Sequence, residues 1–146
     1  MLITILITFI LVVVCVFIHY ELLRSLTNFL PKFKLKARPR MLAVISVVFI
    51  AHIVEISLFA FTYALMQHQW GLGQLTGALE GGWVDYFYFS AASYTTLGMG
   101  DLTPSGHLRF VAAIESLTGL VLIGWSASYT YLAMRKFWDM REIKKK

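Results

Sequence analysis

Three long apolar segments dominate this chain of 146 residues and restrict what it can fold into. They cover residues 2–20, 41–66 and 108–134, and charged residues make up only 14% of the chain, against about a quarter in soluble domains. A helix needs about 20 apolar residues to cross a bilayer. The first segment just suffices, and the other two are long enough to cross with tilt. The sequence therefore predicts an all-α integral membrane protein with three transmembrane helices.

The basic residues indicate how these segments are oriented. Lys and Arg number 13 against 8 Asp and Glu, and twelve of the 13 lie within residues 24–40 or 135–146. Basic residues beside apolar segments mark the cytoplasmic side of a membrane, so the excess predicts contact with anionic lipids rather than nucleic acid. We expect a multi-pass protein of the cell (inner) membrane, with its N-terminus outside and its C-terminus cytoplasmic.

Composition divides the chain into three parts. Residues 1–40 hold the first span and a basic connection, residues 41–134 hold two spans and the segment between them, and residues 135–146 form a basic tail. Within the connection, residues 21–30 have apolar side chains near helical spacing and are expected to form a short interfacial helix. The first span lacks a basic start and a small-residue cleavage site, so a removed signal peptide is not expected.

The segment between the second and third spans is too apolar for an ordinary loop. Its first part is rich in glycine and predicts turns, whereas residues 83–94 form a run of twelve without Gly or Pro. Twelve residues are too few to span a bilayer, so we expect a re-entrant helix whose C-terminal end favours a cation. Residues 95–101 follow and read Thr-Thr-Leu-Gly-Met-Gly-Asp. Alternate glycines let the carbonyls of such a strand face one way, and these can replace the water around a dehydrated cation.

Residues 83–133 resemble the pore module of tetrameric potassium channels, whose usual filter reads Thr-Val-Gly-Tyr-Gly-Asp. The resemblance makes residues 41–134 a pore domain with an outer helix, a pore helix, a filter and an inner helix. It implies a homotetramer that conducts potassium passively, with no catalysis and no cofactor. It also implies that the permeant K⁺ is held by the backbone carbonyls of Thr96, Leu97, Gly98 and Met99.

Further roles follow for the surrounding residues. The resemblance assigns support of the filter to Thr95, Gly100, Asp101, Tyr88 and Phe89, and a hinge to Gly119. Gly124 also permits a bend. Counted from Gly119, helical spacing gives a stripe of Leu120, Ile123, Ala127 and Tyr131. This stripe either lines the pore, with Tyr131 narrowing its cytoplasmic entrance, or packs on neighbouring helices.

Met99 departs from the family pattern, because the family has an aromatic residue there, usually tyrosine, that braces the filter. Methionine is flexible and has no hydroxyl donor, and Ala92 stands where some members carry a carboxylate behind the filter. We therefore expect filter rigidity to depend on packing more than on polar braces. Two alternatives to a potassium channel stay open: a weakly selective monovalent cation channel, and a non-conducting membrane subunit or scaffold.

Three ionisable residues within the spans, His52, Glu55 and Glu115, are functional candidates. His52 and Glu55 lie three positions apart on one helix face. They form either a hydrogen-bonded group with Thr4, Thr8 or His19 of the first span or a proton-sensitive gate. We expect Glu115 to bond near the filter or to a neighbouring helix rather than to touch the ion.

Other classes of function are not expected from the sequence. No nucleophile, metal cluster or carboxylate pair has the spacing that an enzyme needs. No apolar span carries the repeated arginines of a voltage sensor, and we expect no ligand-binding gating domain.

Overall fold

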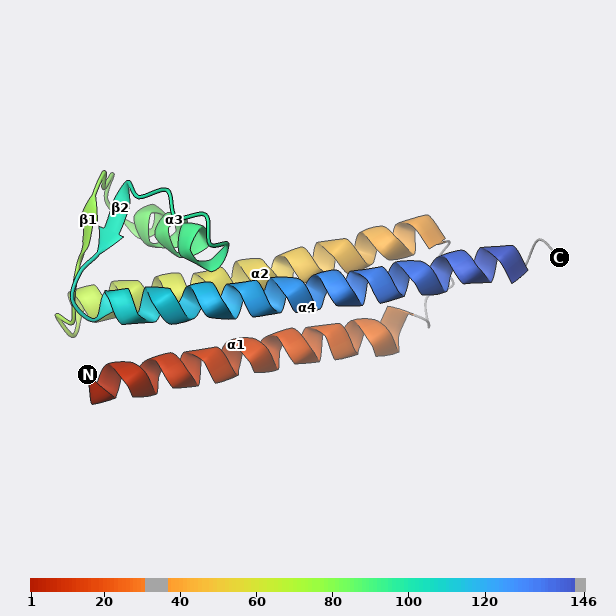
Figure 1. Ribbon diagram of the computed structural model, residues 1–146, viewed down its shortest axis with the longest axis horizontal. Coiled ribbons are helices and arrows are strands. Elements are labelled where there is room, and N and C mark those ends of the chain that lie inside the picture. The colour runs from red at the N-terminus through yellow and green to blue at the C-terminus, as the bar shows by residue number, and fades with distance from the viewer. Residues whose placement is uncertain (31–36, 144–146) are drawn as a thin grey trace.

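The computed structural model describes residues 1–30 and 37–143, with side chains described for residues 1–30 and 38–136. Three long helices, α1 (Leu2–Phe29), α2 (Ala37–His68) and α4 (Leu108–Ile143), lie side by side (Figure 1). The short helix α3 (Trp83–Tyr94) and a small sheet pack at one end, beside the N-terminus, and α4 carries the C-terminus to the opposite end. The lipid contacts expected of residues 32–36 and of most of the tail lie outside the described residues.

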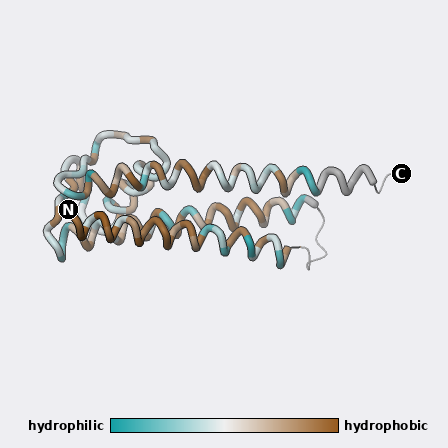
Figure 2. Tube along the Cα trace, turned by 60° about the horizontal axis from the view of Figure 1, so that its bottom comes forward, coloured by the Kyte–Doolittle hydropathy of each residue, from teal (hydrophilic) through white to brown (hydrophobic). Residues whose placement is uncertain are grey.

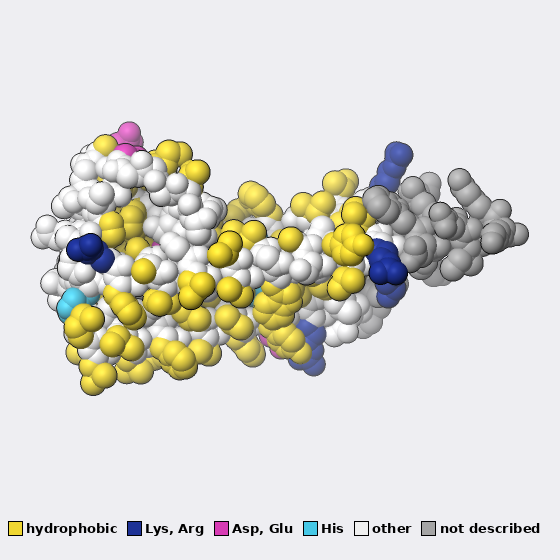
Figure 3. Space-filling model, viewed as in Figure 1, with side chains coloured by type: hydrophobic (Ala, Val, Ile, Leu, Met, Phe, Trp, Pro, Cys, Tyr) yellow, Lys and Arg dark blue, Asp and Glu magenta, His cyan; other side chains and the backbone are white. Residues whose placement is uncertain are grey.

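Each long helix is long and apolar enough to cross a membrane, and the three qualifying segments are Leu2–Phe29, Arg38–His68 and Leu108–Lys136. Hydrophobic residues recur along all three helices (Figure 2), and many of their side chains cover the outer surface (Figure 3). An apolar exterior is stable only against lipid or another apolar surface. The prediction of an all-α membrane protein with three membrane helices is therefore confirmed.

Helix α1 is longer than the sequence indicated. Residues 21–29, expected as a separate interfacial helix, continue α1 without a break, because no Gly or Pro interrupts it. The expectation of a separate helix is therefore wrong. The buried side chains of α1 recur every three or four positions, and they are Thr4, Thr8, Leu11, Cys15, His19, Leu23 and Leu26. This single stripe packs on α2 and α4 along the length of α1.

Two short strands flank α3 and the residues that follow it. Strand β1 (Leu75–Gly77) pairs antiparallel with β2 (Leu102–Pro104), with Leu75 opposite Pro104 and Gly77 opposite Leu102. The sequence predicted only turns in the first of these segments, since three residues are too few to show a strand period. The pairing joins the chain before α3 to the chain after residue 101, so it closes residues 78–101 into one unit.

Gly119 allows α4 to approach the C-terminal end of α3. A Cβ atom at Gly119 would lie 2.0 Å from the backbone oxygen of Tyr94, a distance that no real contact allows. Gly124, further along α4, has no atom within 4 Å of such a Cβ. The two glycines therefore differ: Gly119 is a packing contact, and Gly124 has open space around it.

We expect Gly119→Ala to destabilise the protein by about 1–3 kcal/mol, because the added methyl group must push α4 away from α3. The measurement is the apparent Tm of purified protein in detergent. Gly124→Ala is the matched control, and it should leave Tm unchanged or raise it, since alanine favours a helix by about 0.5–1 kcal/mol. Equal effects of the two substitutions would contradict the assignment of Gly119 as a packing contact.

Candidate functional site

The backbone of residues 95–101, which we call the filter segment, alternates between two conformations. Thr96, Gly98 and Gly100 have φ values of +58°, +57° and +84°, whereas Leu97 and Met99 between them keep negative φ. Alternation of left- and right-handed conformations turns successive peptide groups toward the same side. Within the described part of the chain, Thr96 is the single residue other than glycine with a positive φ.

The amides of the filter segment point back at the end of α3. Four successive N–H groups donate to carbonyls in the last turn of that helix. The pairs are Thr95 to Ala91 at 3.1 Å, Thr96 to Ser93 at 3.0 Å, and Leu97 and Gly98 to Ala92 at 2.9 and 3.2 Å. Among the described residues, no group donates a hydrogen bond to the carbonyls of residues 96–99. The first four amides of the filter segment are thus satisfied by α3, and the carbonyls of residues 96–99 are available as acceptors.

A polar brace fixes the far end of the filter segment. The Tyr88 hydroxyl of α3 donates to Asp101 Oδ2 at 2.7 Å, and the backbone N–H of Leu102 donates to Oδ1 at 3.0 Å. The bond to Asp101 raises the pKa of the Tyr88 phenol above its ordinary value, so the phenol stays a donor. The structure thus has a polar brace at Asp101, and the expectation that rigidity depends on packing more than on polar braces stays a prediction.

Thr95 and Phe89, two further predicted support residues, contact α3 and α2. The Thr95 hydroxyl donates to the Ala91 carbonyl at 2.7 Å. Phe89 is buried and packs edge-to-face on the ring of Tyr63 in α2, with ring centroids 5.1 Å apart. The Met99 side chain is 61% exposed in the single chain, so the single chain supplies no enclosed space for it.

Glu115 joins three helices behind the filter segment. Its buried carboxylate accepts hydrogen bonds from Tyr63 of α2 and Ser90 of α3, and the Ser90 Oγ also lies 2.8 Å from the Ile56 carbonyl oxygen. The expectation that Glu115 bonds to neighbouring helices is confirmed. A proton-sensitive role for this residue stays a prediction.

A second buried group, which we call the polar cluster, consists of His19, His52, Glu55, Tyr94 and Ser126. His19 Nδ1 lies 2.9 Å from Glu55 Oε1, and His52 Nδ1 lies 3.2 Å from Glu55 Oε2. Tyr94 donates its hydroxyl to Glu55 Oε2, and this hydroxyl lies 2.9 Å from His52 Nδ1. Ser126 Oγ lies 3.1 Å from Nε2 of both rings. All four helices therefore meet at this cluster.

The sequence predicted only part of the polar cluster. The contact of Glu55 with His19 is confirmed, whereas Thr4 instead bonds His107 Nδ1 at 2.9 Å and Thr8 bonds the carbonyl of Thr4 at 2.7 Å. The sequence showed no spacing typical of a metal site, yet ligand atoms of His19, His52 and Glu55 lie within 4.8 Å of one another. Spacing along the chain showed His52 and Glu55 together but could not place His19 beside them, because His19 lies on another helix.

Tyr94 and Ser126 were not predicted as members of the cluster. Each comes from a helix that the sequence places far from His19 and Glu55. The sequence offered one signal for each residue: a polar side chain in an otherwise apolar stretch of helix. Such a side chain needs a hydrogen-bond partner when it is buried. That signal does not say which partner it finds.

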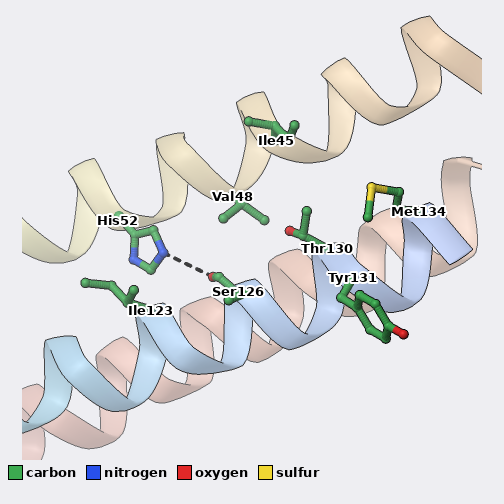
Figure 4. Close-up of a pocket in the computed structure, with 9 residues that line it drawn as sticks. Ile45, Val48, His52, Ile123, Ser126, Thr130, Tyr131 and Met134 are labelled. Carbon is green, nitrogen blue, oxygen red and sulfur yellow. Dashed lines mark hydrogen bonds between the residues drawn. The ribbon is translucent and has the colours of Figure 1, made fainter.

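A groove of about 500 Å³ runs between α2 and α4 from the polar cluster toward the opposite end of the helices. His52 and Ser126 lie together at one end of the groove, and Tyr131 and Met134 lie toward the other (Figure 4). Ile123, Ala127 and Tyr131 of the predicted stripe are exposed along this side of α4 in the single chain. The pore-lining, hinge and gate roles of these residues and of Gly119 and Gly124 stay predictions, as does a proton-sensitive role for His52 and Glu55.

The match to a family model identifies the protein as an ion channel. The family model described as ion channel matches residues 44–136, well over half of the chain. The protein therefore belongs to this family, that of two-span potassium-channel pores, and is not an enzyme. No curated protein and no solved structure matches the chain. Helix α1 lies outside the matched residues.

We expect Ser126→Ala to destabilise the protein by about 1–3 kcal/mol, because two buried imidazole nitrogens lose their shared partner. The measurement is again the apparent Tm in detergent. Ser128→Ala is the matched control: its exposed hydroxyl bonds only the Gly124 carbonyl of its own helix, at 3.0 Å, and its loss should leave Tm within the error. A Tm unchanged by Ser126→Ala would show that the hydroxyl does not hold the two rings.

Proposed function

We propose that this ion channel is selective for potassium and assembles as a homotetramer. The observation that carries the proposal is the filter segment: its first four amides, at residues 95–98, bond to α3, and its carbonyls at residues 96–99 accept no bond within the described chain. A column of backbone carbonyls is the device by which potassium filters replace water around the ion. One chain supplies one side of such a column, so four copies complete the ring.

The distribution of basic residues supports the orientation that we propose for the channel in the membrane. The described basic side chains near the membrane ends, apart from Arg109, lie at the end opposite the filter segment: Arg24, Arg38, Arg40, Arg135 and Lys136. Basic flanks favour the cytoplasmic side, so the filter segment opens outward in this proposal. Asp101 then lies at the outer mouth, where a carboxylate attracts cations.

Flux from reconstituted liposomes tests the proposal. We expect the purified protein to pass K⁺ much faster than Na⁺. Gly98→Ala should abolish K⁺ flux, because alanine at φ +57° is strained and the carbonyl ladder shifts. Gly71→Ala is a close control: Gly71 has φ +58°, and neither glycine has an atom within 4 Å of an added Cβ.

The same assay separates the alternatives. Equal rates for K⁺, Na⁺ and Cs⁺ in the natural protein would indicate a weakly selective cation channel. No flux of any monovalent cation would indicate a non-conducting subunit. Loss of flux in Gly71→Ala as well would mean that the effect of Gly98→Ala is general strain.

We expect Met99→Tyr to raise the preference for K⁺ over Na⁺ by about fivefold. A ring and a hydroxyl would restore a brace for the filter segment, and one hydrogen bond contributes about 1 kcal/mol. The measurement is the reversal potential under bi-ionic conditions, with Met99→Leu as a control that fills similar space without a hydroxyl. An unchanged reversal potential in Met99→Tyr would show that Met99 does not limit selectivity.

A further inference from the structure

The polar cluster has an ordered arrangement of donors and acceptors. Both histidine rings turn Nδ1 toward the Glu55 carboxylate, at 2.9 and 3.2 Å. Both turn Nε2 toward Ser126 Oγ, at 3.1 Å each. His19 and Glu55 are fully buried. The four contacts form a closed ring that alternates imidazole with an oxygen group.

This ring lacks one hydrogen when both imidazoles are neutral. Each of its four contacts needs a hydrogen, while two neutral imidazoles and one hydroxyl supply three. The Tyr94 hydroxyl hydrogen is used in its own bond to Glu55. An unfilled contact leaves lone pairs facing each other beside a fully buried carboxylate, which is unfavourable. The cluster therefore calls for one additional positive charge.

A metal ion placed between the Nδ1 atoms and Glu55 would complete the ring. Two imidazoles and one carboxylate form a common zinc ligand set. Neighbouring ligands of a tetrahedral zinc lie about 3.3 Å apart when each bond is about 2.0–2.1 Å, and the Nδ1–Oε separations already come close to that value.

The surrounding residues match what such ligands need. With Nδ1 on the metal, each ring carries its hydrogen on Nε2, and both can donate to the two lone pairs of Ser126 Oγ. Ligating histidines regularly donate their other N–H in this way. Tyr94 donates to Glu55 Oε2, which holds the carboxylate in place. The His52 side chain is 16% exposed and lies at the end of the groove in Figure 4, which provides a path for an ion.

We propose that His19, His52 and Glu55 bind a divalent transition-metal ion of the zinc type, and that this ion fastens α1 to the pore helices. The site lies outside the filter segment, and the proposal does not depend on which monovalent ion the channel conducts. One metal per chain joins α1 directly to α2, with α3 and α4 holding the ligands through Tyr94 and Ser126.

Metal titration of the purified full chain tests this proposal. Protein in detergent is stripped with EDTA, dialysed, and titrated with Zn²⁺ by calorimetry, and in parallel with Co²⁺, whose visible absorption reports tetrahedral coordination. We expect one Zn²⁺ per chain, a tetrahedral Co²⁺ spectrum, and a Tm that rises with Zn²⁺. Absence of Zn²⁺ binding by the natural protein would overturn the proposal and leave a proton as the additional charge.

Variants identify the ligands. Glu55→Gln and His52→Gln should each lower Zn²⁺ affinity by at least about 100-fold, and Ser126→Ala by about 10–100-fold, because it removes only the support of the ligands. His68→Gln is the control, since His68 is an exposed histidine of the same helix that bonds Tyr86 at 2.9 Å. Circular dichroism of the helices and gel filtration establish which variants fold. If one of the two ligand variants, Glu55→Gln or His52→Gln, does not fold, the other provides the test. Full affinity in the folded ligand variants, or its loss in His68→Gln, would overturn the assignment.

Discussion

The hydrogen bonds between the filter segment and the last turn of α3 are the interaction on which the rest of the structure depends. Non-helical backbone at membrane depth is tolerated only where its polar groups find partners in the protein or face a water-filled cavity. The carbonyls of Ala91, Ala92 and Ser93 take up four amide hydrogens, so the donors of residues 95–98 are satisfied within the chain. The opposite face of the same backbone is left with acceptors alone, and a cation is the natural partner for such a face.

The end of α3 must therefore be held in place, and three contacts do this, one from α2 and two from α4. The polar cluster holds Tyr94 through its hydroxyl, the Gly119 contact brings α4 against the Tyr94 carbonyl, and the Ser116 hydroxyl donates to the Ser93 carbonyl at 2.8 Å. Each contact comes from a spanning helix. The position of the filter segment is thus set by the packing of the whole bundle. A shift of α4 relative to α2 would change the contacts that hold Tyr94.

Much of this arrangement follows from local sequence, and some of it does not. The three spans and the twelve-residue helix were predictable because length and hydropathy decide them residue by residue. The continuity of α1 past residue 20 was not, because a polar stretch with helical spacing suits an interfacial helix as well as the end of a long one. The partners of Glu55 were predictable only as types: a buried carboxylate needs donors, but which helices supply them depends on how the bundle packs. The Tyr88–Asp101 bond was missed for the same reason, since it joins a residue of α3 to the last residue of the filter segment.

The position of His19 has a consequence for how this protein relates to its family. The residues that match the family begin at residue 44, yet Glu55 within them depends on a histidine from α1, which precedes the match. A two-helix pore cut from this chain would place a carboxylate in the hydrocarbon region with its first-helix partner missing. Helix α1 therefore supplies a hydrogen-bond partner to a buried carboxylate of the matched region, and the family match leaves that partner out.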